Sequence, residues 1–227
     1  MSTLELLDPR RHAHLRLRAG AAPLPHFVQI VAAEFPSAAA CCPIFFTKEP
    51  TTGGFYAGAM FGFQPGENLL GSVEERGGFN PLMLQREGFF ISDQNIAIDR
   101  AHERFSDAEG EPLFDAAQQP GDALRGIQRT LGEIHHGLEQ TRAFINALSE
   151  LKLIESIDIS LNFDGAERLT LQGLYTVSLD RLRDVDDAAA LRLFRAGHLQ
   201  LAYTMSTSLR QVARLARLRN RRKSAAA

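Results

Sequence analysis

The sequence predicts an α+β protein with an antiparallel, β-rich N-terminal half, a long central amphipathic helix, a β-hairpin and C-terminal helices. Three observations predict this class: short apolar runs between Gly and Pro turns over residues 43–98, helical apolar spacing over residues 123–152, and an Asp-Gly pair between alternating runs over residues 156–177. The chain has 227 residues, 44% of them hydrophobic, and can bury a sizeable core. We expect a β-rich region, residues 1–122, and a helical region, residues 123–227, in one compact unit.

The N-terminal half begins with an extended basic leader, residues 1–22, in which His12, His14 and Arg16 alternate with apolar residues as in a strand. Residues 37–42 are small and Ala-rich, which favours one or two helical turns. Strands are expected at residues 43–46, 55–63, 68–73, 89–92 and 96–98. The polar, acidic and turn-rich residues 100–122 predict a surface loop.

The central helix is the clearest element of the sequence. Its apolar positions follow the i, i+3, i+4 rule and form one stripe about 100° wide. They are Leu124, Ile127, Leu131, Ile134, Leu138, Ile145 and Leu148. Gly126, Gly132 and Gly137 lie off this stripe, and each weakens the helix by up to about 1 kcal/mol. We therefore expect packing to hold the helix together.

The C-terminal part combines a hairpin with helices. The runs at residues 157–161 and 169–177 flank an Asp164-Gly165 turn, which predicts two antiparallel strands. Short helices are expected at residues 179–184 and from Asp186 or Asp187 to about residue 196, because Ser and Asp precede them as caps. A long helix is expected at residues 199–221.

Charge is distributed unevenly along the chain, although the formal net charge is only -2. No acidic residue follows Asp187, whereas nine basic residues do. On the final helix Arg210, Arg214, Arg217 and Arg221 form a narrow stripe opposite the apolar residues. Three interpretations stay open: the solvated face of a core-packed helix, a docking surface for an acidic partner or for the protein's own acidic body, and a contact with nucleic acid or anionic membrane. The absence of aromatic residues after Tyr203 argues against base stacking.

Targeting and membrane signals are missing from the sequence. The first twenty residues lack the apolar stretch of a secretory signal, and no run of about 18 apolar residues predicts a spanning helix. Cys41 and Cys42 are adjacent and can form only a strained bridge. We interpret them as packing residues in a reducing compartment, with a vicinal thiol metal or redox site as the alternative. A cytoplasmic location is expected.

Recognisable catalytic motifs are also absent. The sequence has no phosphate-binding loop, no dinucleotide fingerprint and no nucleophile elbow. His135 and His136 are neighbours on a helix and cannot chelate one ion at i, i+4 spacing. We predict no metal and no cofactor. Glu34 ends an apolar run, and is interpreted as a helix-start carboxylate or, alternatively, as a buried acid.

An ordered set of short sequence motifs, called words below, resembles a known protein family. The words include Glu34-Phe35, Cys42-Pro43-Ile44, Gly66-Glu67-Asn68-Leu69, Pro112-Leu113-Phe114-Asp115 and Arg195-Ala196-Gly197-His198-Leu199. In this order they are similar to the SapC family of bacterial proteins, which is named for a surface-layer-associated protein. The resemblance covers nearly the whole chain. It implies an association with bacterial surface layers, and relatives are often encoded beside outer-membrane receptors and flavin-dependent halogenase-like proteins.

Two functions follow as hypotheses. The first is a non-catalytic accessory protein that binds a protein or peptide partner of a surface-layer or outer-membrane-associated system, with Arg210, Arg214, Arg217 and Arg221 as contact residues and with no nucleic acid. Self-association is left open. The second is an enzyme or enzyme subunit that modifies a peptide or small molecule, working with a halogenase-like partner. Its candidate site residues are polar residues of the family words or beside apolar strands: Glu34, Glu67, Asn68, Arg86 and Asp99.

Overall fold

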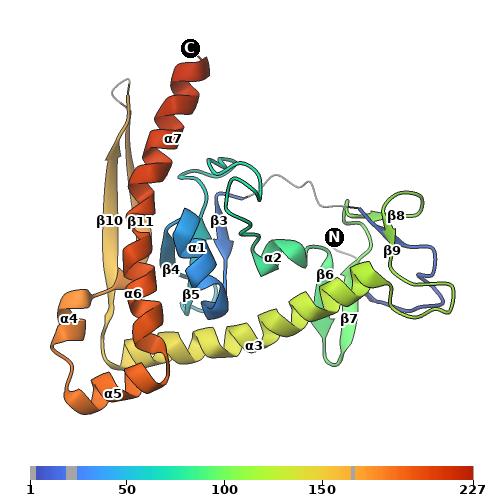
Figure 1. Cartoon of the computed structure of the whole chain (residues 1–227), viewed down its shortest axis with the longest axis horizontal. Coiled ribbons are helices and arrows are strands. Elements are labelled where there is room, and N and C mark those ends of the chain that lie inside the picture. Colours follow the sequence, from blue (N-terminus) through green and yellow to red (C-terminus); the bar gives the residue numbers. More distant parts are fainter. Residues whose placement is uncertain (1–3, 19–24, 165–166, 227) are drawn as a thin grey trace. The chain divides into compact units, whose positions relative to one another are not determined.

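The computed structural model describes residues 4–18, 25–164 and 167–226, which form two compact units (Figure 1). Unit 1 comprises Met1–Ala22 and Leu82–His136, and unit 2 comprises Pro23–Pro81 and Gly137–Ala227. Antiparallel sheets and several helices, one of them long and central, confirm the α+β prediction. The units are interleaved along the chain, and the partition at residue 122 stays a prediction.

Unit 1 contains two small antiparallel sheets. Their orders are β1(Leu4–Leu6)-β7(Asn95–Asp99)-β6(Phe89–Ser92) and β8(Phe105–Ser106)-β2(Arg16–Leu17)-β9(Glu111–Pro112), and the unit also holds α2(Leu82–Gln85). Apolar residues in and beside these strands, and in the first turns of α3(Asp122–Glu150), share one core: Leu15, Leu17, Phe89, Ile98, Phe105, Leu113, Phe114, Leu124, Ile127 and Leu131. The predicted strand through His12 and His14 is wrong, because a turn forms where the His12 amide donates to the Asp8 carbonyl.

The strand predicted at residues 68–73 is also wrong. Gly66 and Gly71 take positive φ angles of 81° and 64°, which a strand does not allow. The Asn68 side chain accepts a hydrogen bond from the Leu70 amide at 3.0 Å. Local side-chain bonding of this kind competes with a sheet ladder and gives turns instead.

Unit 2 is built on a five-stranded sheet. Its order is β10(Ile154–Asn162)-β11(Arg168–Val177)-β4(Ile44–Lys48)-β5(Phe55–Met60)-β3(Phe27–Gln29), and every neighbouring pair is antiparallel. Strands β10 and β11 confirm the predicted hairpin, although Gly165 of its turn lies outside the described residues. Residues 55–60 of the strand predicted at 55–63 are a strand.

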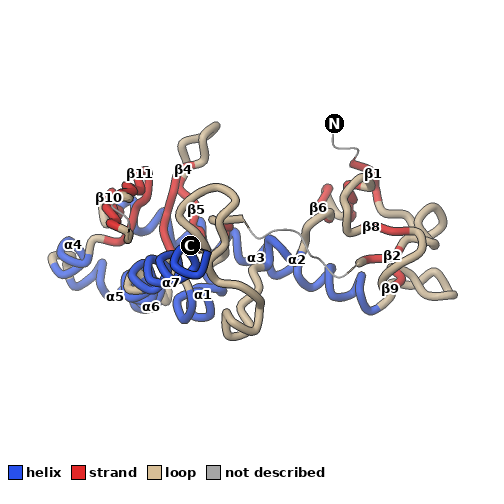
Figure 2. The backbone as a smooth tube through the Cα atoms, turned by 90° about the horizontal axis from the view of Figure 1, so that it is seen from above, coloured by secondary structure: helices blue, strands red, loops and turns tan. Residues whose placement is uncertain are grey.

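Unit 2 also contains several helices. They are η1(Ala32–Glu34), α1(Phe35–Cys41), the second half of α3(Asp122–Glu150), α4(Leu179–Arg183), α5(Asp187–Arg195), α6(His198–Ser208) and α7(Gln211–Ala226). Figure 2 shows α1, α6 and α7 together on one side of β4, β10 and β11. Phe144 of α3 is fully buried, and its ring lies 6.0 Å from Phe35 and 5.9 Å from Phe46. These aromatic contacts join α3, α1 and β4 in one core.

The single helix predicted at residues 199–221 is two helices, and this corrects the prediction. The break falls at Leu209 and Arg210, between α6 and α7. The cause is Ser208, whose hydroxyl donates to the Met205 carbonyl at 2.6 Å and accepts from the Ile44 amide at 2.9 Å. A serine that bonds back to its own helix bends it, and here the same oxygen also satisfies the first amide of β4.

The glycines of α3 differ from one another. An added Cβ at Gly126 or Gly132 would meet no described heavy atom within 4 Å, whereas at Gly137 it would lie 2.6 Å from Val31 Cγ2. Beside Gly137, the Thr141 hydroxyl donates to the Gly137 carbonyl and accepts from the Ala32 amide at 2.8 Å. Gly137 thus allows the segment before α1 to approach the helix closely.

Among the described helices, none combines the length and apolar character needed to cross a membrane.

Candidate functional site

A groove in unit 2 opens where β11 leaves β4. Among the described residues, these strands form a single ladder pair, Tyr175 with Phe46. Gly173 explains the divergence, because it takes a φ of 74° where the register between β10 and β11 shifts. A glycine with positive φ at a register shift is typical of a β-bulge, which bends its strand. The Thr47 hydroxyl donates to the Gly173 carbonyl at 3.2 Å and takes the place of a ladder bond.

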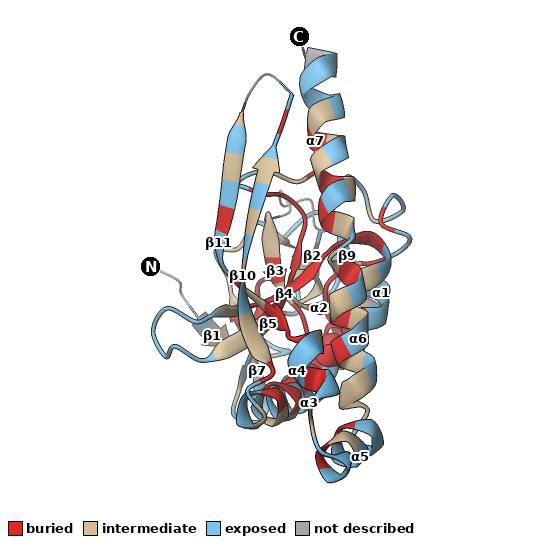
Figure 3. Cartoon of the chain, turned by 90° about the vertical axis from the view of Figure 1, so that its left-hand side faces the viewer, coloured by how far each residue is buried: buried red, intermediate tan, exposed pale blue. Residues whose placement is uncertain are grey.

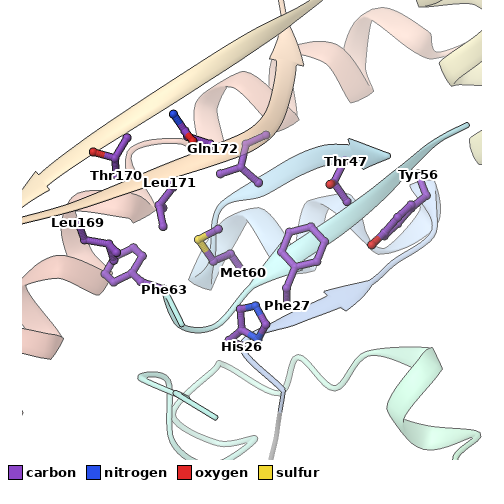
Figure 4. Close-up of a pocket in the computed structure, with 11 residues that line it drawn as sticks. His26, Phe27, Thr47, Tyr56, Met60, Phe63, Leu169, Thr170, Leu171 and Gln172 are labelled. Atoms are coloured by element: carbon purple, nitrogen blue, oxygen red, sulfur yellow. The ribbon is translucent and has the colours of Figure 1, made fainter. Parts of the chain in front are cut away.

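The groove has a volume of about 470 Å³, and both apolar and polar residues line it (Figure 4). Leu169 and Leu171 of β11 point toward Phe63 and Met60, whereas Thr170 and Gln172 point away. Thr170 and Gln172 nevertheless line the groove, along the part of β11 that does not pair with β4. This edge of β11 therefore offers backbone groups with no neighbouring strand, next to alternating apolar side chains.

The opposite wall is formed by β3 and β5. The Phe27 ring lies directly over Gly58, so a Cβ at position 58 would collide with that ring. His26 and Tyr56 flank Phe27 and add polar groups to the wall (Figure 4). Burial, followed by the nearby Glu49 charge, raises the pKa of Tyr56. Tyr56 is thus a neutral hydroxyl that can donate or accept a hydrogen bond at physiological pH.

One end of the groove leads to a buried ion cluster. The Phe63 and Phe163 rings are tilted against each other with a centroid distance of 5.8 Å, and Arg219 of α7 lies over Phe163 at 4.6 Å. Arg219 is only 6% exposed. Its Nε is 3.1 Å from Glu67 Oε1, and its Nη2 is 3.1 Å from Glu167 Oε1. This arginine fastens α7 to the loop after β5 and to the hairpin.

The Glu67-Asn68 word therefore lies against the C-terminal helix. Glu67 Oε2 also accepts from the Phe63 amide at 2.7 Å, and Arg222 donates to the Asn68 carbonyl. Lys223 pairs with Glu167. Part of the basic C-terminus is thus bound by acidic groups of the same chain.

The four arginines predicted to contact a partner are placed differently from one another. Arg210, Arg217 and Arg221 are exposed, and Figure 3 shows α7 becoming exposed toward its C-terminal end. Arg210 donates from Nε to the Thr207 carbonyl at 3.1 Å. Arg214 is half-buried and donates to the Cys41 carbonyl at 2.8 Å. Arg214 thus holds α7 against the end of α1.

The other candidate residues fall in both units. In unit 2, Glu34 is buried and its Oε2 accepts from the Val31 amide at 2.9 Å, which is the role of a helix-start carboxylate. In unit 1, Arg86 donates to the Phe89 carbonyl at 3.1 Å, and burial lowers its pKa. Asp99 Oδ1 accepts from the Ala101 amide at 3.3 Å. Within unit 2, Glu67 and Asn68 are brought to α7, and Glu34 lies at the start of α1.

Sequence reasoning missed the groove and the special role of Arg219. The alternation of Leu169 and Leu171 predicted a strand face but not that β4 leaves part of it uncovered. Arg219 stood off the arginine stripe, and this was the only sequence signal that it differs from Arg217.

A second cavity of unit 2, also about 470 Å³, lies beside the groove and shares Tyr56 with it. Its lining includes the charged and polar residues Glu49, Thr141, Arg142 and Asn146. Thr141 already bonds to Gly137 and Ala32, whereas Arg142 is exposed. This cavity brings a carboxylate, a guanidinium and a phenol around one space.

Comparison with known proteins gives one match. The model of the SapC family matches residues 7–215. The chain belongs to the SapC family. The match spans both units, the groove and the start of α7, so the SapC resemblance of the ordered words is confirmed. No curated protein and no solved structure matches this SapC chain significantly.

Proposed function

We propose that this SapC-family chain is a non-catalytic accessory protein that binds an extended, apolar segment of a partner protein in the groove beside β11. The observation that carries the proposal is the single β4–β11 pair, which leaves a strand edge next to a cleft lined by alternating leucines. An added strand gains main-chain hydrogen bonds from such an edge, and pockets for alternate side chains give it specificity. The volume of about 470 Å³ lies within the usual range of ligand sites.

The surrounding system is proposed from the family: a bacterial surface-layer or outer-membrane-associated assembly, with the chain acting in the cytoplasm. The partner surface beyond the groove is proposed to be acidic, because Arg210, Arg217 and Arg221 are exposed on a segment with no acidic residue. Arg214 is left out of this proposed partner surface, because its guanidinium already binds the Cys41 carbonyl.

Selection from a displayed library of random heptapeptides tests the groove. The wild-type chain is expected to enrich peptides with apolar residues at alternating positions. Gly58→Ala should weaken the selected peptides at least tenfold, because the new Cβ pushes the Phe27 ring off β5. Gly132→Ala is the matched control and should leave binding unchanged. Equal binding by both variants would show that the peptides lie elsewhere.

A charge test addresses the exposed arginines separately. Capture of the partner from a bacterial lysate should weaken when Arg210, Arg217 and Arg221 are changed to Glu together. The weakening should be greatest at low salt, since exposed charges are screened at high ionic strength. If neither the triple substitution nor the salt concentration alters capture, these arginines are not part of the interface.

The second candidate is an enzyme or enzyme subunit acting on a peptide or small molecule. The observation that favours it is the second cavity, where Glu49, Tyr56 and Arg142 converge. Ligand-observed NMR with a set of amino acids and dipeptides is the test. Binding that Arg142→Gln abolishes and Gly58→Ala spares would favour this cavity over the groove.

A further inference from the structure

Two adjacent thiols lie at the end of α1. Cys41 is the last residue of the helix and Cys42 follows it in extended conformation. Both are buried, and their sulfurs are 3.7 Å apart. The Ala38 carbonyl lies 3.2 Å from Cys42 Sγ and 3.5 Å from Cys41 Sγ. This geometry holds both sulfurs on one side of the chain.

Two arginines from other elements lie close enough to the cysteine pair for their charges to act on it. Arg214 of α7 donates to the Cys41 carbonyl at 2.8 Å. Arg76, from the loop after β5, is 3% exposed, and its Nε and Nη1 have no hydrogen-bond partner in the described part of the chain. Its guanidinium lies over the Phe61 ring at 5.4 Å. A buried cation placed in this way is unfavourable unless negative charge lies near it.

The thiol pair, together with the Glu74 carboxylate, can provide that negative charge. The Cys42 hydrogen bond, then the charges of Arg214 and Arg76, lower the pKa of Cys41 against the effect of burial. The same hydrogen bond, together with burial, raises the pKa of Cys42. One sulfur is thereby favoured as a thiolate while its neighbour keeps its proton. This division of roles is the one that a nucleophilic and a resolving thiol require.

We propose that Cys41 and Cys42 form a peroxide-reactive dithiol, in which Cys41 is the nucleophile, Cys42 resolves the product, and Arg76 and Arg214 stabilise the thiolate. The Cys41 thiolate attacks one oxygen of hydrogen peroxide, the O–O bond breaks, and the departing hydroxide takes up a proton as water. The sulfenic acid then reacts with the Cys42 thiol, the S–O bond breaks, and a second water leaves. Two thiols and one peroxide give one disulfide and two waters.

The product is a strained, reversible bond. The sulfurs must close from 3.7 Å to about 2.05 Å across a single peptide. Strained disulfides have higher reduction potentials and are reduced readily, which suits a regulatory rather than a structural bond. Arg214 joins the Cys41 carbonyl to α7. Formation of the disulfide would therefore alter the contact between α7 and the end of α1.

Intact-mass analysis of the full chain after treatment with hydrogen peroxide tests the proposal. The wild type should lose two hydrogens, resist alkylation by iodoacetamide, and regain both thiols with a dithiol reductant. Cys42→Ser should stop at a sulfenic acid on Cys41 that dimedone traps, and Cys41→Ser should react at least tenfold more slowly. A wild-type chain that keeps two free thiols overturns the proposal.

Arg76→Gln should slow oxidation at least tenfold, and Arg195→Gln, the same change at an exposed site on α5, should not. Equal rates in these variants overturn the role of Arg76. If Arg76→Gln fails to fold, the pH dependence of iodoacetamide alkylation in the wild type tests whether the Cys41 thiolate is stabilised. The Cys42 hydrogen bond, followed by the charges of Arg214 and Arg76, lowers the pKa of Cys41 and predicts an alkylation midpoint below the ordinary thiol value. A midpoint at or above that value overturns the proposal.

Discussion

Arg217 and Arg219 lie two residues apart on α7 and belong to different environments. Arg219 is buried, bridges Glu67 and Glu167, and covers the Phe163 ring. Arg217 is exposed on the opposite side of the helix. Two residues turn a helix by about 200°, so this separation is geometric. The comparison shows that the basic C-terminus has an inner, structural side and an outer side that is free for a partner.

The glycines of α3 repeat this lesson. Gly132 has open space around its Cα, whereas Gly137 allows Val31 to approach the helix. The same residue type is tolerated at one position and required at the other. Variants at these four positions can break or sharpen the comparison.

Arg219→Ala should have the largest effect. Its removal takes the arginine partner from Glu67 and Glu167, of which Glu167 keeps Lys223, and uncovers Phe163. Because Glu67 and Glu167 are partly exposed, water moderates the loss, and we expect a destabilisation of about 2 to 3 kcal/mol. Urea unfolding followed by circular dichroism measures it. Arg219→Lys keeps the charge but not the forked contacts, so its stability should lie between those of the wild type and Arg219→Ala. A loss in Arg219→Ala no larger than that in Arg217→Ala would contradict the structural role of Arg219.

Gly137→Ala should destabilise the chain by about 1 to 2 kcal/mol in the same measurement. The added methyl group overlaps the stiff, branched Val31 side chain, and the gain in helix propensity offsets only part of that strain. Restoring space with Gly137→Ala and Val31→Ala together should recover part of the loss. No recovery would mean that the clash lies elsewhere.

Gly132→Ala should change stability in the opposite direction, by about 0.5 to 1 kcal/mol in favour of the folded state. The position is helical, no described atom crowds it, and alanine restricts the unfolded chain. A higher midpoint of thermal unfolding would register the gain. A lower midpoint would show that α3 needs flexibility at this position.

Arg217→Ala should have the smallest effect on stability, within about 0.5 kcal/mol, because an exposed side chain away from special contacts contributes little. Its effect should be confined to partner capture. Loss of stability comparable to that of Arg219→Ala would erase the distinction between the two sides of α7.

Much of the fold could be predicted because the deciding interactions are local. The Leu124 to Leu148 stripe fixed the central helix, the alternation around Asp164 fixed the hairpin, and Glu34 could be recognised as a helix-start carboxylate. Predictions failed where a distant group competed with local preference. Ser208 binds the Ile44 amide across 164 residues and divides the last helix, and the turns at Gly66 and Gly71 displace a strand with an adequate apolar pattern.

The candidate site was less accessible to sequence reasoning. The sequence identifies Glu67 and Asn68 as candidate site residues, but it does not predict their contacts with α7. The groove depends on how far β11 follows β4, and a bulge at Gly173 decides this.

By itself, the sequence determined the fold class, the helical and strand periods, the family and the basic charge of the C-terminus, because each depends on residues close together or on composition. The tertiary structure alone decided which arginine is buried, which glycine is required, and that Arg214 of α7 binds the Cys41 carbonyl. These properties depend on contacts between segments far apart in the chain, which no local pattern records.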